Sequence, residues 1–374
     1  MRMHLRNKII YLVKSNLSYY PPCMSQIEML ADLGVSVEVW FGSSGETACE
    51  RLDARGIPYK QLVDPRCDAL GKLDVVYNWA SFRRAVLREL KRECREDVLL
   101  WFGSGETAMP MIGALHGWRY VVSALELYDD VPVKRQLLGK IAKGATAVTA
   151  CQLTRAYLMR QWWGLKQLPF VFPNKPYGLA LQGKLPLTCE RTRKVIEAIG
   201  DKPFVLYQGI LQNEQYVAEI ANALAAMNRD IAFVMLGIDR TGMAPRIKQI
   251  YKNTLYFESI PAPLHLEVTS RAAIGVVFYD GANLNKAFCA PNKIYEYSAF
   301  GLPMLANDIP GLLGTVGAYG AAECVSLTCE EIAAAFERMF ANYQAYSDNA
   351  KRFYRDTDNV ATMKRLLSFL EDGC

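Results

Sequence analysis

Apolar segments of strand length alternate along the chain with amphipathic segments of helix length. The first strand candidate is NKIIYLV, residues 7–13, and a helical pattern at 24–34 separates it from a second candidate, VSVEVWF, at 35–41. A strand, helix, strand order opens a doubly wound parallel sheet, in which ligands bind beyond the carboxyl ends of the strands. We therefore expect an α/β fold whose first loop, at 14–23, faces a ligand.

The same alternation continues to the C-terminus and predicts two domains. The chain has 374 residues, 51% of them hydrophobic, which suffices for two cores in domains of about 150 to 200 residues each. The strand candidate at 168–176 ends the first domain, and KPFVLYQG at 202–209 opens the second. Between them the helical pattern from 177 to 200 is weak and broken by a proline, as is typical of a linker.

Two similar turns follow apolar strands, WFGSSGETA at 40–48 and WFGSGETA at 101–108. Glycine permits a tight turn, and Glu46 or Glu106 in the first turn of the next helix complements its dipole. The alternative is a phosphate cradle, but an acidic residue beside each loop would repel phosphate. We interpret both as structural strand-to-helix turns.

Other features of the composition exclude several classes of protein. No apolar run approaches transmembrane length, and IIYLV is too short for the apolar region of a signal peptide. The ten cysteines contain no CxxC pair, and the three histidines show no metal-ligand spacing. We expect a cytoplasmic protein with reduced thiols and no metal.

Positive charge is concentrated in the first half of the chain. Residues 1–176 carry 24 Lys and Arg against 17 Asp and Glu, whereas the remainder carries 19 against 21. Much of the excess lies at 81–96, where apolar and basic stripes alternate at helical spacing. The apolar stripe is Phe82, Val86, Leu90 and Cys94, and the basic one is Arg84, Arg88, Lys91 and Arg95. This helix either has a solvated basic face or lies on an anionic membrane surface.

Two further interpretations concern partners of the first half. Trp162 and Trp163 either pack in the core or dip into lipid, and we favour packing. Nucleic acid is disfavoured as a partner, because the net charge of +5 is modest and no aromatic side chains interleave with the basic ones.

The most informative stretch is CAPNKIYEYSAFGLPMLANDIPG, residues 289–311. Pro291 and Asn292 can open a helix after the apolar strand candidate AIGVVFY. Lys293 and Glu296 are three residues apart and share a face of its first turn. A helix start attracts phosphate through unpaired N–H groups and the macrodipole, although the same spacing also suits an exposed ion pair.

Within this stretch, PNKIYEYSAFGLPML resembles the donor-site segment of GT-B glycosyltransferases, especially those similar to glycosyltransferase family 4, or group 1. FPNKP at 172–176 and YQG at 207–209 resemble the same family more weakly. The resemblance implies the GT-B fold, with two Rossmann-like doubly wound domains facing each other across a cleft. It assigns 1–176 to the acceptor domain, 177–355 to the nucleotide-sugar donor domain and 356–374 to a C-terminal helix that packs back on the first domain.

The resemblance also implies donor-site residues. Glu296 matches the glutamate that binds the ribose hydroxyls, and the turn at Gln208 and Gly209 abuts the diphosphate. Asn292 and Lys293 lie at the helix start that meets the same diphosphate. Lys293 would stabilise the charge that grows on the leaving diphosphate, without a metal or another cofactor.

Two departures from the family pattern concern the donor site. Phe288 stands where the family has an earlier glutamate that contacts the transferred sugar, and Asn283 and Asn285 are the nearby polar candidates. Ile210 and Leu211 stand where a basic residue often follows the glycine turn. Lys293 is then the main cation at the phosphates.

Acceptor-side residues are implied more weakly. Glu126 lies where similar enzymes place a histidine that faces the sugar, so it either acts as a general base, positions the sugar, or caps the next helix. Asp129 is the second choice. Asn16 and Tyr19 would face the cleft from the first loop, and His265 is interpreted as a satisfied histidine.

The expected activity is therefore transfer of a sugar, with retention, from a nucleotide diphosphate sugar, UDP-linked by preference, to a glycan or lipid-linked acceptor. Synthesis of a capsule, exopolysaccharide or other cell-surface polysaccharide at the cytoplasmic membrane face is the expected setting. Two alternatives stay open: a non-catalytic GT-B partner subunit, motivated by Phe288, and a GT-B sugar-nucleotide epimerase. A nicotinamide oxidoreductase is disfavoured because no GxGxxG occurs.

Overall fold

The computed structural model describes residues 8–43, 45–62, 72–181, 183–211 and 213–372. The chain forms two compact units. The first consists of residues 1–178, 283–285 and 358–374, and the second of 179–282 and 286–357. The boundary predicted from the sequence is residue 176, and the predicted return to the first unit is residue 356.

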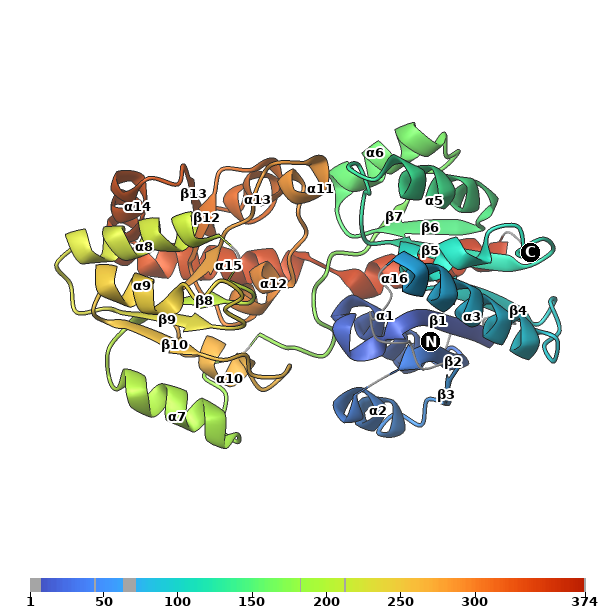
Figure 1. The fold of residues 1–374 in the computed structure, drawn as a ribbon, viewed down its shortest axis with the longest axis horizontal. Helices are drawn as coiled ribbons and strands as arrows, with labels where there is room; N and C mark the ends of the chain where they lie inside the picture. Colours follow the sequence, from blue (N-terminus) through green and yellow to red (C-terminus); the bar gives the residue numbers. More distant parts are fainter. Residues whose placement is uncertain (1–7, 44, 63–71, 182, 212, 373–374) are drawn as a thin grey trace. The chain divides into compact units, whose positions relative to one another are not determined.

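The first unit contains a seven-stranded parallel sheet with the order β3-β2-β1-β4-β5-β6-β7 (Figure 1). The strands are β1 (Lys8–Asn16), β2 (Val37–Ser43), β3 (Tyr59–Gln61), β4 (Val98–Phe102), β5 (Arg119–Ala124), β6 (Ala147–Ala150) and β7 (Phe170–Val171). The helices are α1 (Pro21–Asp32), α2 (Glu46–Asp53), α3 (Lys72–Leu90), α4 (Gly105–Ala108), α5 (Pro132–Gly144), α6 (Leu153–Trp163) and α16 (Asn359–Asp372), with short 3₁₀ turns η1 (Leu17–Tyr19) and η2 (Met109–Met111).

The central strand β1 explains why the first apolar run is continuous. Ile9 and Tyr11 enter a core shared with α1 and α16, whereas Ile10 and Leu12 enter a second core shared with α3, α5 and α6. Successive side chains of a strand point to opposite faces, and both faces of this sheet are covered. The strand extends to Asn16 and α1 begins at Pro21, so the first loop is shorter than predicted.

The second unit contains a six-stranded parallel sheet with the order β10-β9-β8-β11-β12-β13. The strands are β8 (Phe204–Gln208), β9 (Ala232–Leu236), β10 (Thr254–Phe257), β11 (Ile274–Val277), β12 (Met304–Asn307) and β13 (Ala322–Val325). The helices are α7 (Glu190–Ile199), α8 (Glu214–Ala226), α9 (Ala244–Ile250), α10 (Leu266–Thr269), α12 (Asn292–Ala299), α13 (Pro310–Leu312), η3 (Leu313–Gly317), α14 (Cys329–Ala341) and α15 (Tyr343–Asp356), and α11 (Leu284–Ala287) is divided between the two units after Asn285. Both sheets confirm the predicted α/β class with two doubly wound domains.

Strand order fixes where each unit can bind a ligand. In the second sheet the chain starts at β8, builds outward to β10, and then returns to the other side of β8 with β11. The sheet of the first unit reverses in the same way between β1 and β4. The crevice beyond the carboxyl ends of the strands at such a reversal is the usual ligand site of an open α/β sheet.

Both WFG turns join a strand to a helix, as predicted. One lies between β2 and α2, and the other between β4 and α4, with Glu46 and Glu106 in the first helical turns. The Ser104 hydroxyl accepts a hydrogen bond from the Thr107 N–H at 3.2 Å and caps α4. Lys134 pairs with Glu106 at 2.6 Å. The second turn is therefore held by contacts within the protein.

The linker interpretation of 177–200 is wrong over its second half, where α7 forms from Glu190 to Ile199. Its buried residues, Thr192, Val195 and Ile199, are spaced three and four apart and face the core. The buried carboxylate of Glu267 accepts hydrogen bonds from the N–H groups of Thr188 and Cys189 and anchors the start of this helix. Tertiary packing thus stabilises a helix whose sequence pattern is weak.

The helix predicted at 81–96 ends earlier than expected, because α3 stops at Leu90 and Cys94 is exposed. Phe82, Val86 and Leu90 are buried in the core, so the apolar stripe packs on the sheet. Arg88 is exposed and pairs with Glu89 at 3.5 Å. The exposed surface of this helix carries basic side chains, together with Val75, Val76 and Tyr77 near its start.

Candidate functional site

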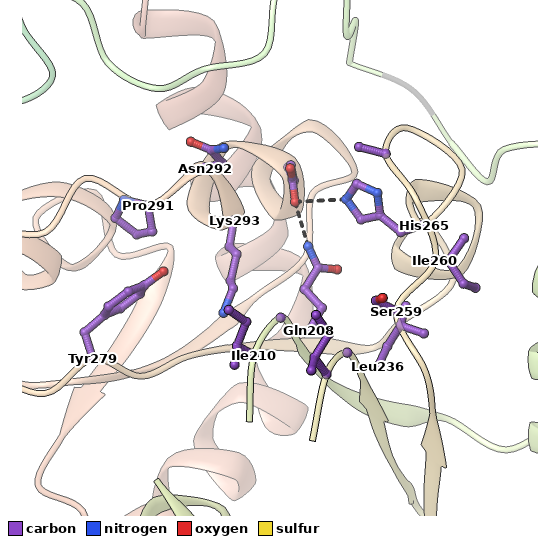
Figure 2. Close-up of a pocket in the computed structure, with 15 residues that line it drawn as sticks. Gln208, Ile210, Leu236, Ser259, Ile260, His265, Tyr279, Pro291, Asn292 and Lys293 are labelled. Atoms are coloured by element: carbon purple, nitrogen blue, oxygen red, sulfur yellow. Dashed lines mark hydrogen bonds and ion pairs between the residues drawn. The ribbon is translucent and has the colours of Figure 1, made fainter. Parts of the chain in front are cut away.

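A cavity of about 470 Å³ lies at the carboxyl ends of the strands of the second unit (Figure 2). Gln208 and Gly209 reach it from the end of β8, and Leu236 from the end of β9. Tyr279 follows β11, and the start of α12 closes the wall. The cavity thus occupies the position at the β8–β11 reversal where the topology predicts a ligand.

The start of α12 faces this cavity without a side-chain cap. Pro291, at the N-cap position, has an extended backbone (φ −75°, ψ 141°), and among the side chains that the structure describes none accepts from the first N–H groups of the helix. Pro291, Asn292 and Lys293 all line the cavity. The eight-residue helix therefore presents its positive end, with uncapped donors, to the ligand position.

Lys293 is the cation of this site. Its Nζ lies 5.3 Å from the ring centre of Tyr207 and 5.6 Å from that of Tyr279. Within the described part of the chain, the ammonium has neither a hydrogen-bond acceptor nor an ion-pair partner. Burial disfavours the charged form and lowers the pKa of Lys293 to about 8, an effect that the carboxylate of Glu296 partly offsets. Such a lysine is poised for an anionic ligand.

Gly209 makes room for this lysine. Its φ of +117° lies in a region that other residues rarely adopt, and a Cβ at this position would lie 3.0 Å from the Nζ of Lys293. A Cβ on Gly237 would lie 1.6 Å from the Gly209 carbonyl oxygen. The two glycines allow the loops after β8 and β9 to approach each other and leave backbone surface open to the cavity.

Glu296 is held by two side chains from other elements. Its Oε2 accepts a hydrogen bond from the Nε2 of Gln208 at 2.6 Å, and the Nε2 of His265 lies 3.4 Å from the same atom. Figure 2 shows both contacts as dashed lines. The Oε1 of Gln208 accepts from the Thr269 hydroxyl at 2.7 Å. This network fixes the carboxylate against one wall of the cavity.

All five predicted donor-site residues line this one cavity: Gln208, Gly209, Asn292, Lys293 and Glu296. Phe288, which replaces the earlier glutamate of the family pattern, is half-buried and does not line it.

His265 was interpreted as a satisfied histidine, and it lines the cavity with its Nε2 3.4 Å from the Glu296 carboxylate. Ser259 and Tyr279 also line the cavity and were not predicted. The only available signal was that each follows a strand in the half of the sheet that carries the site.

The predicted acceptor-side residues belong to the first unit, and three of them contact one another. The Glu126 carboxylate is half-exposed; it accepts a hydrogen bond from the Nδ2 of Asn285 at 2.5 Å and lies 3.9 Å from Arg155. Asp129 accepts from the backbone N–H of Leu284 at 2.6 Å and of Asn285 at 3.2 Å. Glu126 caps no helix, since no side chain caps α5.

The two predicted residues of the first loop lie apart from that group in the sequence. The Asn16 side chain accepts from the Ser18 N–H at 2.9 Å and caps η1. Tyr19 is 79% exposed. Asn16 therefore has a local structural task, whereas Tyr19 is open to a partner.

The described residues contain neither a metal site nor a helix that could span a membrane. No group of three or more His, Cys, Asp or Glu converges as a metal site in that part of the chain. Among the helices described, none combines the length and apolar character that crossing a membrane requires.

No family model matches the sequence, and no curated protein matches it. Solved structures do resemble it. Anabaena Alr3699/HepE in complex with UDP and glucose superposes with a TM-score of 0.69 at 14% identity, over 98% of this chain and 99% of that chain. A glycosyltransferase from Rickettsia africae gives 0.66 at 12% identity, over 98% of each chain. A putative UDP-N-acetylglucosamine 2-epimerase from Listeria monocytogenes gives 0.63 at 11% identity, over 95% of this chain and 94% of that chain.

TM-scores of 0.63–0.69 establish a shared fold, whereas identities of 11–14% leave the activity to be argued from the residues of this chain. The similarity extends over nearly the whole of both chains in each comparison and includes both parallel sheets. The protein therefore has the GT-B fold that its sequence resemblance implied.

Proposed function

We propose that this protein binds a UDP-sugar in the cavity of the second unit and transfers the sugar to an acceptor. The observation that carries the proposal is the ammonium of Lys293, which forms no direct ion pair or hydrogen bond with the described residues and lies at an uncapped helix start. A cation and a helix dipole aimed at one position favour a diphosphate there. The UDP complexes of HepE support the choice of nucleotide.

The remaining walls of the cavity suit the rest of a nucleotide. The Glu296 carboxylate can accept hydrogen bonds from a pair of ribose hydroxyls, which are donors. Leu236, Ile238 and Ile260 form an apolar wall on the side of β9 and β10, where a flat base can pack. Diphosphate, ribose and base thus each meet side chains of matching chemistry.

In the proposed reaction, Lys293 and the start of α12 stabilise the negative charge that develops on the leaving diphosphate. The lysine needs no proton transfer for this role, because its pKa of about 8 leaves most of the ammonium charged at neutral pH. Glu126 is the proposed base or positioning residue for the acceptor hydroxyl, with Asp129, Asn285, Asn16 and Tyr19 as further sugar or acceptor contacts. We propose retention of configuration and a glycan or lipid-linked acceptor of a cell-surface polysaccharide, on the strength of the family resemblance.

A second candidate is a sugar-nucleotide epimerase. The likeness to the Listeria protein and the presence of His265 beside Glu296, in the same cavity, favour it. A non-catalytic partner subunit remains the third, motivated by Phe288. Only the first two require a nucleotide in the cavity.

Calorimetry and product analysis separate these candidates. We expect UDP and UDP-glucose to bind and GDP to bind more weakly. Lys293→Met should lower the affinity for UDP by at least about tenfold, because the charge at the diphosphate is lost. Lys286→Met is the matched control, since Lys286 pairs with Asp280 at 2.9 Å outside the cavity.

The products then identify the reaction. Transfer, or slow hydrolysis of UDP-glucose to UDP and glucose, supports the transferase. Conversion of UDP-N-acetylglucosamine to its 2-epimer, monitored by NMR, would support the epimerase instead of the transferase. An absence of nucleotide binding at millimolar concentration would leave the partner subunit.

A further inference from the structure

A second cavity, of about 410 Å³, lies on the first unit and is lined only by residues of α5 and α6, which pack against each other (Figure 1). Three of the lining residues are cationic, Arg135, Lys140 and Lys143, and two are the neighbouring aromatics Trp162 and Trp163. None of the described carboxylates lines it. The donor cavity shares none of these residues.

The three cations lack partners of opposite charge. Among the residues described, none of the three side chains forms an ion pair or a hydrogen bond, and the guanidinium of Arg135 lies over the ring of Trp162, 4.9 Å from its centre. Lys140 and Lys143 are three residues apart on one helix, a spacing at which like charges repel. An anion in the cavity would relieve this repulsion.

Trp163 supplies an unused donor in the wall of this cavity. Its side chain is 3% exposed, and its Nε1–H has no hydrogen-bond acceptor among the described residues. Gly139 permits the close approach, since a Cβ there would lie 2.6 Å from the Cδ1 of Trp163. A buried donor without an acceptor is costly, so an acceptor atom supplied by a ligand would be favourable.

A neighbouring cavity of about 560 Å³ shares Lys143 with the first. Leu165, Leu168, Phe170 and Phe369 are among its apolar lining residues, and Thr146, Lys166 and Gln167 are polar ones. Free inorganic phosphate would make no use of the apolar side chains. A molecule that carries a phosphate on an apolar chain would use both cavities.

We propose that the cavity between α5 and α6 binds the phosphate of an anionic lipid headgroup, with part of the acyl chain against the leucine and phenylalanine side chains of the cavity beside it. Arg135, Lys140 and Lys143 neutralise the phosphate, and Trp162 lies at the level of the headgroup, where amphipathic aromatic rings are favoured. The site differs from α3, whose apolar side packs in the core, and it does not depend on the activity proposed for the second unit.

Vesicle flotation with the full chain tests the site. We expect binding to phosphatidylcholine vesicles that contain phosphatidylglycerol and none to pure phosphatidylcholine. Lys140→Gln/Lys143→Gln should weaken binding by at least about tenfold, because each basic residue near an anionic surface contributes roughly fivefold. Both lysines are exposed, so an unchanged thermal midpoint checks that the fold is intact.

Arg84→Gln/Arg88→Gln on α3 is the matched control, since it removes the same charge from another exposed helix face. We expect binding within about twofold of the parent. An equal loss of vesicle binding in both double variants would show that the protein is attracted by its net charge and not by this site. Failure of the parent to bind anionic vesicles would overturn the proposal.

Two further arms identify the source of the phosphate. Inorganic phosphate at millimolar concentration, with ionic strength matched by sodium chloride, should leave the vesicle complex intact; displacement would show a site for free phosphate instead. Brominated acyl chains should quench tryptophan fluorescence of the parent, and Trp162→Phe should reduce that quenching. Unchanged quenching in Trp162→Phe would contradict the proposed place of the chain.

Discussion

The Nε2 of Gln208 donates a hydrogen bond to the Oε2 of Glu296 over 2.6 Å, which joins the end of β8 to α12. The Thr269 hydroxyl holds the other end of the Gln208 amide, so the direction of this donor is fixed. His265 approaches the same Oε2. Among the described residues, no donor reaches the Oε1 of Glu296, and this atom is left to accept from a ligand hydroxyl.

Glu296→Gln should weaken UDP binding by about tenfold, because a neutral amide forms weaker hydrogen bonds with the ribose hydroxyls than a carboxylate does. With its NH₂ group toward Gln208, the new glutamine would also remove the acceptor that the Gln208 Nε2–H now has. Calorimetry with UDP measures the effect. Glu330→Gln, an exposed substitution at the start of α14, is the control and should bind as the parent does. Equal affinity in Glu296→Gln and the parent would remove Glu296 from the ribose site.

UDP affinity should fall as the pH rises through about 8, the pKa of Lys293. Above this value the amine loses its proton and with it the charge that attracts the diphosphate. Because a bound diphosphate favours the ammonium, binding near pH 8 should take up protons. Calorimetry at pH 8 in buffers of different ionisation enthalpy detects that uptake. A flat affinity between pH 7 and 9 would mean that the diphosphate does not contact Lys293.

The stability of the unliganded protein should show the opposite trend with pH. Burial lowers the pKa of Lys293 from 10.5 to about 8, so the unfolded chain holds this proton more tightly than the folded one. Stability therefore rises with pH between about 8 and 10.5, and the cost of the buried charge is fully present below 8. Lys293→Met should stabilise the protein by about 1–2 kcal/mol at pH 7. That gain should shrink by pH 10 in urea unfolding, and a constant gain would assign it to packing.

Gly209→Ala should impair folding and nucleotide binding together. At φ +117° a Cβ strains the backbone, and its position 3.0 Å from the Nζ of Lys293 forces the ammonium to move. The expected cost is about 1–3 kcal/mol of stability, measured by urea unfolding. Gly314→Ala is the matched control, because nothing lies within 4 Å of a Cβ there. Loss of UDP affinity without loss of stability would point to the ammonium alone.

The five donor-site residues were predicted through the family resemblance. Spacing alone left Lys293 and Glu296 open to interpretation as an exposed ion pair. The contacts of Glu296 with Gln208 and His265 could not be predicted, since 88 and 31 residues separate these partners and only the sheet order brings them together. The same limit explains α7, whose start is anchored by Glu267, 79 residues from Thr188.

Prediction of the fold from the sequence succeeded where a pattern repeats locally. The apolar run at β1 required a strand buried on both faces, and the glycine turns after β2 and β4 required tight turns before helices. The end of α3 was predicted too late, because Cys94 continues the apolar spacing although the helix ends at Leu90. Spacing records which face a residue would occupy and carries little information about where a helix stops.

Glu126→Gln should slow sugar transfer by roughly 100-fold or more if the carboxylate acts as the proposed base, and it should leave UDP affinity unchanged. The amide keeps the size of the side chain and can still contact Asn285, but it cannot accept a proton. Transfer rates and UDP calorimetry on the same preparation separate the two effects. Asp130→Asn in the same loop is the control, because Asp130 contacts Asn283 and not Glu126. Unchanged turnover in Glu126→Gln would exclude it as the base, and a parallel loss of UDP affinity would indicate that the substitution disturbs the fold instead.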